Sequence, residues 1–127
     1  MAASLSAFLS QNAKRPDIHK FVVSDRFTDE NGKPVEWEYG CISGKENADI
    51  SNRYAENRSG YTAALAVACT RFPDLQNADL QDSYGVKSAE ELIQVMLVSG
   101  EYNNYVSKIF EANKFKVTPE LVDEAKN

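Results

Sequence analysis

His19 is the single histidine of the chain, and it is the first candidate for acid–base chemistry. A general base needs a partner within hydrogen-bond distance of its ring, and no catalytic cysteine or serine motif stands near this position. The residue lies between Pro16 and the first segment with strand periodicity. We therefore expect a solvated loop histidine rather than a catalytic one.

Two groups of acidic residues could suggest a cation site. Asp25, Asp29 and Glu30 form the first group, but the Asp-x-Asp-x-Asp-Gly spacing of a calcium loop is absent. We interpret them as turn and strand-edge residues. The second group, which we interpret as helix caps and part of a solvated face, consists of Asp74, Asp79 and Asp82.

The two cysteines, Cys41 and Cys69, are too few and too far apart for a disulfide framework or a zinc site. Both lie in apolar periodic runs, where a free cysteine packs as a small hydrophobic residue, and this usage fits a reducing cytoplasm. The glycines Gly40, Gly44 and Gly60 are too dispersed for a phosphate-binding loop. The sequence therefore predicts no catalytic residue, no metal, no cofactor and a non-enzymatic function.

The composition is typical of a globular domain. The chain has 127 residues, 43% hydrophobic and 26% charged, and we expect one domain over residues 1–127 with flexible ends at 1–20 and 117–127. A net charge of −5 with scattered basic residues disfavours nucleic acid as a partner. No run approaches the ~20 apolar residues of a membrane span, and Met1–Ala13 lacks the positive start of a signal peptide. We expect no membrane partner and a cytoplasmic location.

The N-terminal segment carries Leu5, Phe8 and Leu9 at helical spacing, with Ser4 as a candidate cap. One or two helical turns are marginal in water, so this apolar side must dock on another surface. Docking on its own domain is the simpler interpretation, because terminal segments usually fold back or fray. Docking on a partner is the alternative, and it makes these three residues candidates for partner binding.

A β-hairpin is the best-defined local structure. Val35, Trp37, Tyr39 and Cys41 alternate with polar residues and glycine, which is the period of a half-buried strand. The preceding strand places its apolar residues at odd positions as well, at Phe21, Val23 and Phe27.

The register of this hairpin follows from keeping both apolar sets on one face. A two-residue turn at Asn31-Gly32 would place Phe27 opposite Glu36, whereas a three-residue loop of residues 30–32 places Phe27 opposite Val35. A slip of one residue would expose the whole apolar set, so we expect the longer loop, with Gly32 in the left-handed conformation. The other pairs expected in this register are Val23 with Tyr39, Arg26 with Glu36, and Asp29 with Lys33.

Helical patterns follow the hairpin. Two capping boxes, Ser43 with Glu46 and Ser88 with Glu91, each predict a helix start. The expected helices are residues 43–57, an alanine-rich helix at 61–72, a short capped helix within 74–84, one from 88 to a stop at Gly100, an amphipathic one from 101 to about 110, and a last one from Thr118-Pro119. We therefore expect an α+β fold with an N-terminal β-hairpin followed by a bundle of four or five short helices.

The stretch Phe72–Val86 is the most particular of the chain. Pro73 ends the preceding helix, Asp74 or Asn77 can cap a short new one, and Gly85 closes it in the left-handed conformation. The apolar face left on this turn is the first place to look for a partner groove. Its residues are Leu75, Leu80 and Tyr84, and the alternative is that they cover the core.

These segments, in this order, resemble the XkdN-like tail assembly chaperones of phages and phage-like elements in Gram-positive bacteria. The resemblance runs from about residue 4 to about residue 115 and rests on the segments Leu5–Leu9, Phe21–Phe27, Asp29–Trp37, Phe72–Val86 and Gly100–Tyr105. Residues 44–60 show no such likeness. The resemblance implies a non-enzymatic protein that coats the helix-rich tape measure protein, keeps it soluble, and gives way as tail tube subunits assemble. It also implies self-association, a second contact with the tail tube protein, action in the host cytoplasm and absence from the mature virion.

Two other functions remain open on the sequence. A structural tail tube or connector subunit would form stable homopolymers or rings and would be rich in strands, whereas this chain is rich in helix after one hairpin. A small hydrolase or regulator would need a concave pocket with perturbed titrating groups.

Overall fold

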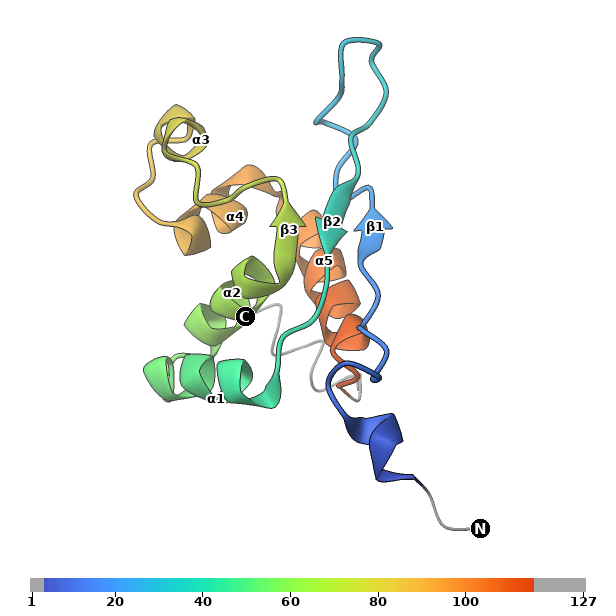
Figure 1. The fold of residues 1–127 in the computed structure, drawn as a ribbon. Helices are drawn as coiled ribbons and strands as arrows, with labels where there is room; N and C mark the ends of the chain where they lie inside the picture. The colour runs from blue at the N-terminus through green and yellow to red at the C-terminus, as the bar shows by residue number, and fades with distance from the viewer. Residues whose placement is uncertain (1–3, 116–127) are drawn as a thin grey trace.

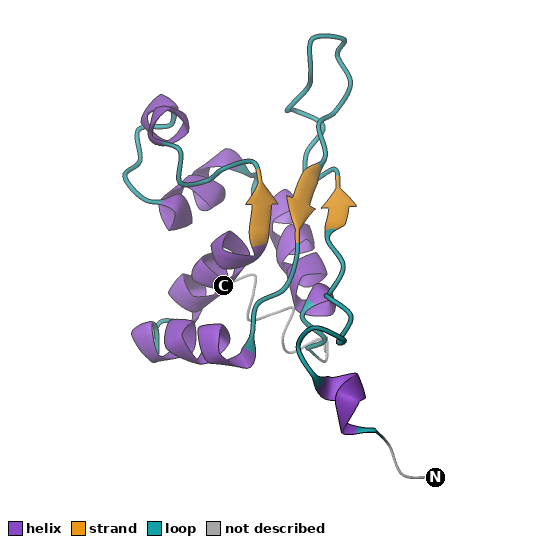
Figure 2. Cartoon of the chain, viewed as in Figure 1, coloured by secondary structure: helices purple, strands orange, loops and turns teal. Residues whose placement is uncertain are grey.

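The computed structural model describes residues 4–115. The elements are a 3-10 helix η1 (Leu5–Phe8), strands β1 (His19–Phe21), β2 (Trp37–Tyr39) and β3 (Thr70–Phe72), and helices α1 (Gly44–Arg53), α2 (Arg58–Cys69), α3 (Ala78–Ser83), α4 (Ala89–Met96) and α5 (Ser99–Ala112). The strands form one antiparallel sheet in the order β1-β2-β3. In Figures 1 and 2, α5 runs behind the sheet, α1 to α4 lie on the β3 side, and η1 lies beyond the start of β1. The α+β fold expected from the sequence is confirmed.

The tip of the hairpin has the expected register. Thr28 pairs with Pro34, and the Val35 amide donates to the Phe27 carbonyl at 2.8 Å. Gly32 has a φ of +79°, the left-handed conformation that the three-residue loop requires.

The base of the hairpin differs from the expectation. Tyr39 pairs with His19 instead of Val23, a shift of four residues. The chain leaves the ladder over residues 22–26 because Val23 is buried in the core and Arg26 turns away from the sheet. The expected pairs of Val23 with Tyr39 and of Arg26 with Glu36 are therefore wrong. The shift is an even number of residues, so the alternation of faces is preserved.

A third strand replaces the end of the alanine-rich helix. Helix α2 ends at Cys69, and Thr70–Phe72 pairs with β2, so the expectation of a helix through Phe72 is wrong. Pro73 disfavours the helical region for Phe72, and residues with β-branched or aromatic side chains suit a strand.

Three helices begin at the expected caps, whereas α2 begins at Arg58, capped by Asn57, rather than at residue 61. Side-chain oxygens of Ser43, Asn77 and Ser88 accept hydrogen bonds from the first turns of α1, α3 and α4. Helix α1 ends at Arg53 rather than near residue 57, and Gly100 lies in the first turn of α5 rather than ending α4. The Glu101 carboxylate accepts from the Val98 amide at 3.0 Å and so caps α5. The helix expected from Thr118-Pro119 lies outside the described residues.

The core lies between the sheet and helices α2, α4 and α5. Helix α2 contacts α1, α4 and α5, and its buried alanines, such as Ala63 and Ala66, permit this close approach. On the sheet side, the Tyr105 ring of α5 meets Trp37 edge-on at 5.2 Å and Tyr39 at 5.5 Å between centroids. These contacts fix the sheet to α5.

Candidate functional site: an apolar groove beside the hairpin

The three candidate residues of the 72–86 stretch have different environments. Leu75 is 4% exposed and belongs to the core cluster. Leu80 is half-buried and packs against that cluster, while Tyr84 is 37% exposed. Asn77 caps α3, and Gly85 follows it with a φ of +69°. The turn before α3 therefore covers the core through Leu75, α3 packs on the core through Leu80, and Tyr84 at the end of α3 is exposed.

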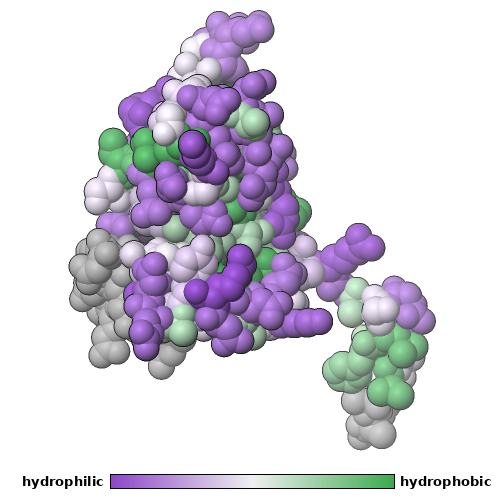
Figure 3. All heavy atoms as spheres, turned by 90° about the vertical axis from the view of Figure 1, so that its left-hand side faces the viewer, coloured by the Kyte–Doolittle hydropathy of each residue, from purple (hydrophilic) through white to green (hydrophobic). Residues whose placement is uncertain are grey.

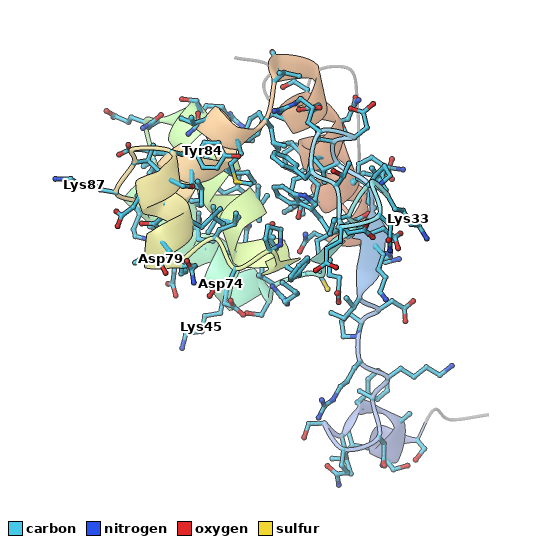
Figure 4. All side chains as sticks on the ribbon, turned by 90° about the horizontal axis from the view of Figure 1, so that it is seen from above. Lys33, Lys45, Asp74, Asp79, Tyr84 and Lys87 are labelled. Atoms are coloured by element: carbon cyan, nitrogen blue, oxygen red, sulfur yellow. The ribbon has the colours of Figure 1, made fainter. Side chains whose placement is uncertain are left out.

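A groove of about 420 Å³ lies between the hairpin, the end of β3, and helices α3 and α4. Its lining is mostly apolar. Of the residues that the sequence suggests for partner binding, Leu80 belongs to this lining. The other described lining residues are Arg26, Phe27, Thr28, Val35, Trp37, Phe72, Pro73 and Met96. Figure 4 views the fold from above, with Tyr84, Asp74 and Asp79 on the α3 side and Lys33 on the hairpin side.

Phe72 is the most informative residue that sequence reasoning missed here. Its side chain is 46% exposed, although it is a large aromatic residue at the end of β3. Because the sequence predicts a helix through residue 72, it places Phe72 on the buried face of that helix. The signal that could have found it is Pro73, because the extended backbone before a proline takes the preceding side chain off the helical face.

Arg26 is the charged residue among the described lining residues, and its charge is already paired. Its guanidinium donates to the Glu101 carboxylate at 2.8 Å and to the Met96 carbonyl at 2.6 Å. The hydrogen bond from Arg26 lowers the pKa of Glu101 to about 2, and bonds from Ser24 and the Val98 amide act in the same direction. The Arg26 pKa is raised, chiefly by Glu101 and in small part by Tyr84. The groove therefore offers an apolar surface with little net charge.

The N-terminal candidates lie apart from the groove. Leu5 is 78% exposed, Phe8 72% and Leu9 42%, with Ser4 capping the short turn as expected. In Figures 1 and 3 this segment stands away from the body of the fold, and its apolar residues form a green patch in Figure 3. Within the described residues, docking on its own domain is not found.

The residues considered for chemistry are dispersed. His19 is exposed and stacks on Tyr39 with centroids 5.3 Å apart. Across residues 4–115, no three His, Cys, Asp or Glu side chains gather as metal ligands would. Cys69 is buried, which raises the pKa of its thiol, and Cys41 is half-buried. No helix in the part of the chain that the structure describes could span a bilayer.

The sequence model for the phage XkdN-like tail assembly chaperone proteins matches residues 5–126. The chain belongs to this family. The resemblance seen in the sequence is thus confirmed, and the family is one of assembly chaperones rather than of enzymes. The phage-like element PBSX protein XkdN of Bacillus subtilis (strain 168) is 30% identical, over 97% of this chain and 93% of its own length.

A second relative has a solved structure with the same fold. The protein YqbN of Bacillus subtilis (strain 168) is 27% identical over 95% of this chain and 91% of its own length. The crystal structure of YqbN superposes with a TM-score of 0.85 at 24% identity, over 91% of this chain and 100% of that chain. The arrangement of sheet and helices described above is therefore shared with an experimentally determined structure.

Proposed function

We propose that this chain binds the tape measure protein during tail assembly, keeps it soluble, and promotes assembly of the tail tube around it. The observation that carries the proposal is membership of the XkdN-like tail assembly chaperone family over residues 5–126. The protein acts in the cytoplasm of the bacterial host and leaves before the virion is complete. The tail tube protein is the second partner.

The groove beside the hairpin supports this proposal because it offers a binding mode for a helix. An amphipathic helix binds by placing its apolar side chains in such a groove, and a tape measure protein is rich in helix. The lining offers Phe27, Phe72 and Met96 to these side chains. Arg26 is held by Glu101, so it opposes the entry of apolar side chains less than a free cation would.

Co-expression with the tape measure protein of the same gene cluster, followed by affinity capture, tests the function. We expect a tape measure protein that is insoluble alone and soluble in a stoichiometric complex with this chain. If it gains no solubility and this chain is found in purified tails, the protein is a structural tail subunit and the proposal is refuted.

Three substitutions test the groove. Phe72→Asp places a charge at an exposed position of the lining and should abolish capture of the tape measure protein. Tyr84→Asp places a charge at the exposed end of α3, outside the lining, and should weaken capture less. Val95→Asp is the matched control, because Val95 is 54% exposed on α4 and lies outside the lining. Leu80→Asp should also weaken capture, but Leu80 packs on the core, so circular dichroism must first show that this variant is folded. Equal capture by all folded variants would exclude the groove.

A further inference from the structure

The N-terminal arm, residues 4–18, extends from the fold. All of its residues are exposed, and the described hydrogen bonds of residues 4–13 stay within the arm, such as that from the Asn12 side-chain Nδ2 to the Ser6 carbonyl at 2.9 Å. A single turn of four residues, Leu5–Phe8, is too short to be stable alone in water. The exposed Leu5 and Phe8 therefore favour a surface that buries them.

The groove has the matching chemistry. Its volume of about 420 Å³ lies within the range of sites that enclose small ligands, so it can receive large apolar side chains. Phe72 stands partly exposed at its edge. In the arm, the turn at Leu5–Phe8 provides two large apolar side chains, with Leu9 directly after them.

The arm and the rest of the chain carry net charges of opposite sign. Lys14 and Arg15 against Asp17 give the arm a charge of +1, so the remainder of this chain of net charge −5 carries −6. Exposed Asp25, Glu36 and Asp74 are sequence neighbours of lining residues. A basic segment that follows the apolar turn is therefore attracted to the acidic remainder of a second copy.

The position of the arm favours the groove of another molecule. The arm joins the fold at the start of β1, the end of the sheet remote from the hairpin tip (Figure 1). Residues 10–18 span at most ~30 Å when extended. To reach its own groove, the arm would have to reverse direction and run along the sheet, whereas it projects freely toward a neighbour.

We propose that the N-terminal arm of one copy docks in the groove of a second copy, with Phe8 and Leu5 inserted between the hairpin and α3. The contact is head-to-tail, because arm and groove are different surfaces, and it leaves a free groove at one end and a free arm at the other. Such contacts build open chains unless the rotation between copies closes a ring. This self-association requires no tape measure protein, so it is tested separately from the proposed function.

Sedimentation velocity of the full chain over a range of concentrations tests the proposal. We expect oligomers that grow with concentration and weaken at high salt, because screening reduces the charge attraction. Phe8→Asp in the arm and Phe72→Asp in the groove should each raise the dissociation constant by about tenfold or more. Val95→Asp should behave as the unaltered chain. Phe72→Ser replaces Phe72→Asp if the latter loses its folded circular dichroism spectrum.

Mixing the two variants separates this model from every other contact. Phe8→Asp keeps an intact groove and Phe72→Asp keeps an intact arm, so an equimolar mixture should form a dimer that cannot extend. An unaltered chain that is monomeric at all concentrations would overturn the proposal, including the case in which hydrogen exchange shows its arm protected in its own groove. Oligomers that form in either variant with the dissociation constant of the unaltered chain, or a mixture that stays monomeric, would overturn it as well.

Discussion

Replacing Tyr105 by phenylalanine tests whether α5 holds β3 in place. The Tyr105 hydroxyl lies 2.6 Å from the Thr70 hydroxyl, and Thr70 in turn donates to the Ala66 carbonyl at 2.7 Å. The Thr70 proton is thus engaged, so Tyr105 is the donor between the two hydroxyls. Tyr105→Phe removes this bond and leaves the ring contacts with Trp37 and Tyr39 in place.

The expected loss is small and defined. One neutral hydrogen bond contributes about 1 kcal/mol to the free energy of unfolding, which lowers Tm by roughly 3–5 °C in a domain of this size. Tyr105→Ala should lower the free energy of unfolding by about 3–5 kcal/mol, because it also empties the space of a fully buried ring. Tyr84→Phe is the control, since Tyr84 is 37% exposed, and it should change stability by less than about 0.5 kcal/mol.

Urea unfolding of Tyr105→Phe, Thr70→Val and the double variant measures the bond directly. The two single changes should be non-additive by about 0.5–1.5 kcal/mol. Additive losses would mean that the hydroxyls do not interact and would refute this account of how β3 is held.

Three further predictions follow from other contacts. Glu101→Gln should be less stable than the unaltered chain at pH 7. Because the pKa of Glu101 falls from 4.5 to about 2 on folding, this difference in stability should be present above pH 4.5 and should shrink as the pH falls toward 2. Urea unfolding at several pH values measures it. Asn113→Ala should lower the free energy of unfolding by about 1–3 kcal/mol, because the Asn113 side chain accepts from the Ile42 amide at 3.0 Å and donates to the Ile109 carbonyl at 2.8 Å. A melting temperature within about 1 °C of that of the unaltered chain, which corresponds to about 0.3 kcal/mol, would contradict this. Cys41 should react with a thiol reagent well before Cys69, whose burial raises the pKa of its thiol, and equal rates under native conditions would show that the α2 end opens readily.

Local signals in the sequence were enough for the caps and for the hairpin tip. Ser43, Asn77 and Ser88 act within one helical turn, and Gly32 acts within one loop, so neighbouring residues decide these features. The base of the hairpin depends on Arg26, which reaches Met96 and Glu101 far along the chain. No local pattern encodes that contact, and this is why the expected ladder between Val23 and Tyr39 fails.

The candidate groove was predictable only in part. Leu80 could be identified from the capped turn, whereas Phe27, Val35 and Phe72 come from separate segments that tertiary packing brings together. The burial of Leu75 could not be predicted either, because Leu75 lies in the turn before α3, where no helical periodicity separates buried from exposed positions.

The aromatic contact between the sheet and α5 also has a consequence for biosynthesis. Trp37 and Tyr39 are covered by Tyr105, which the ribosome adds much later. At typical elongation rates the delay between Tyr39 and Tyr105 is about 3–13 s. Throughout this interval the face of the nascent hairpin that packs on α5 lacks the Tyr105 ring. A shortened chain that stops before Tyr105 would keep the Trp37 and Tyr39 rings uncovered on that face, so we expect it to aggregate more readily than the full chain.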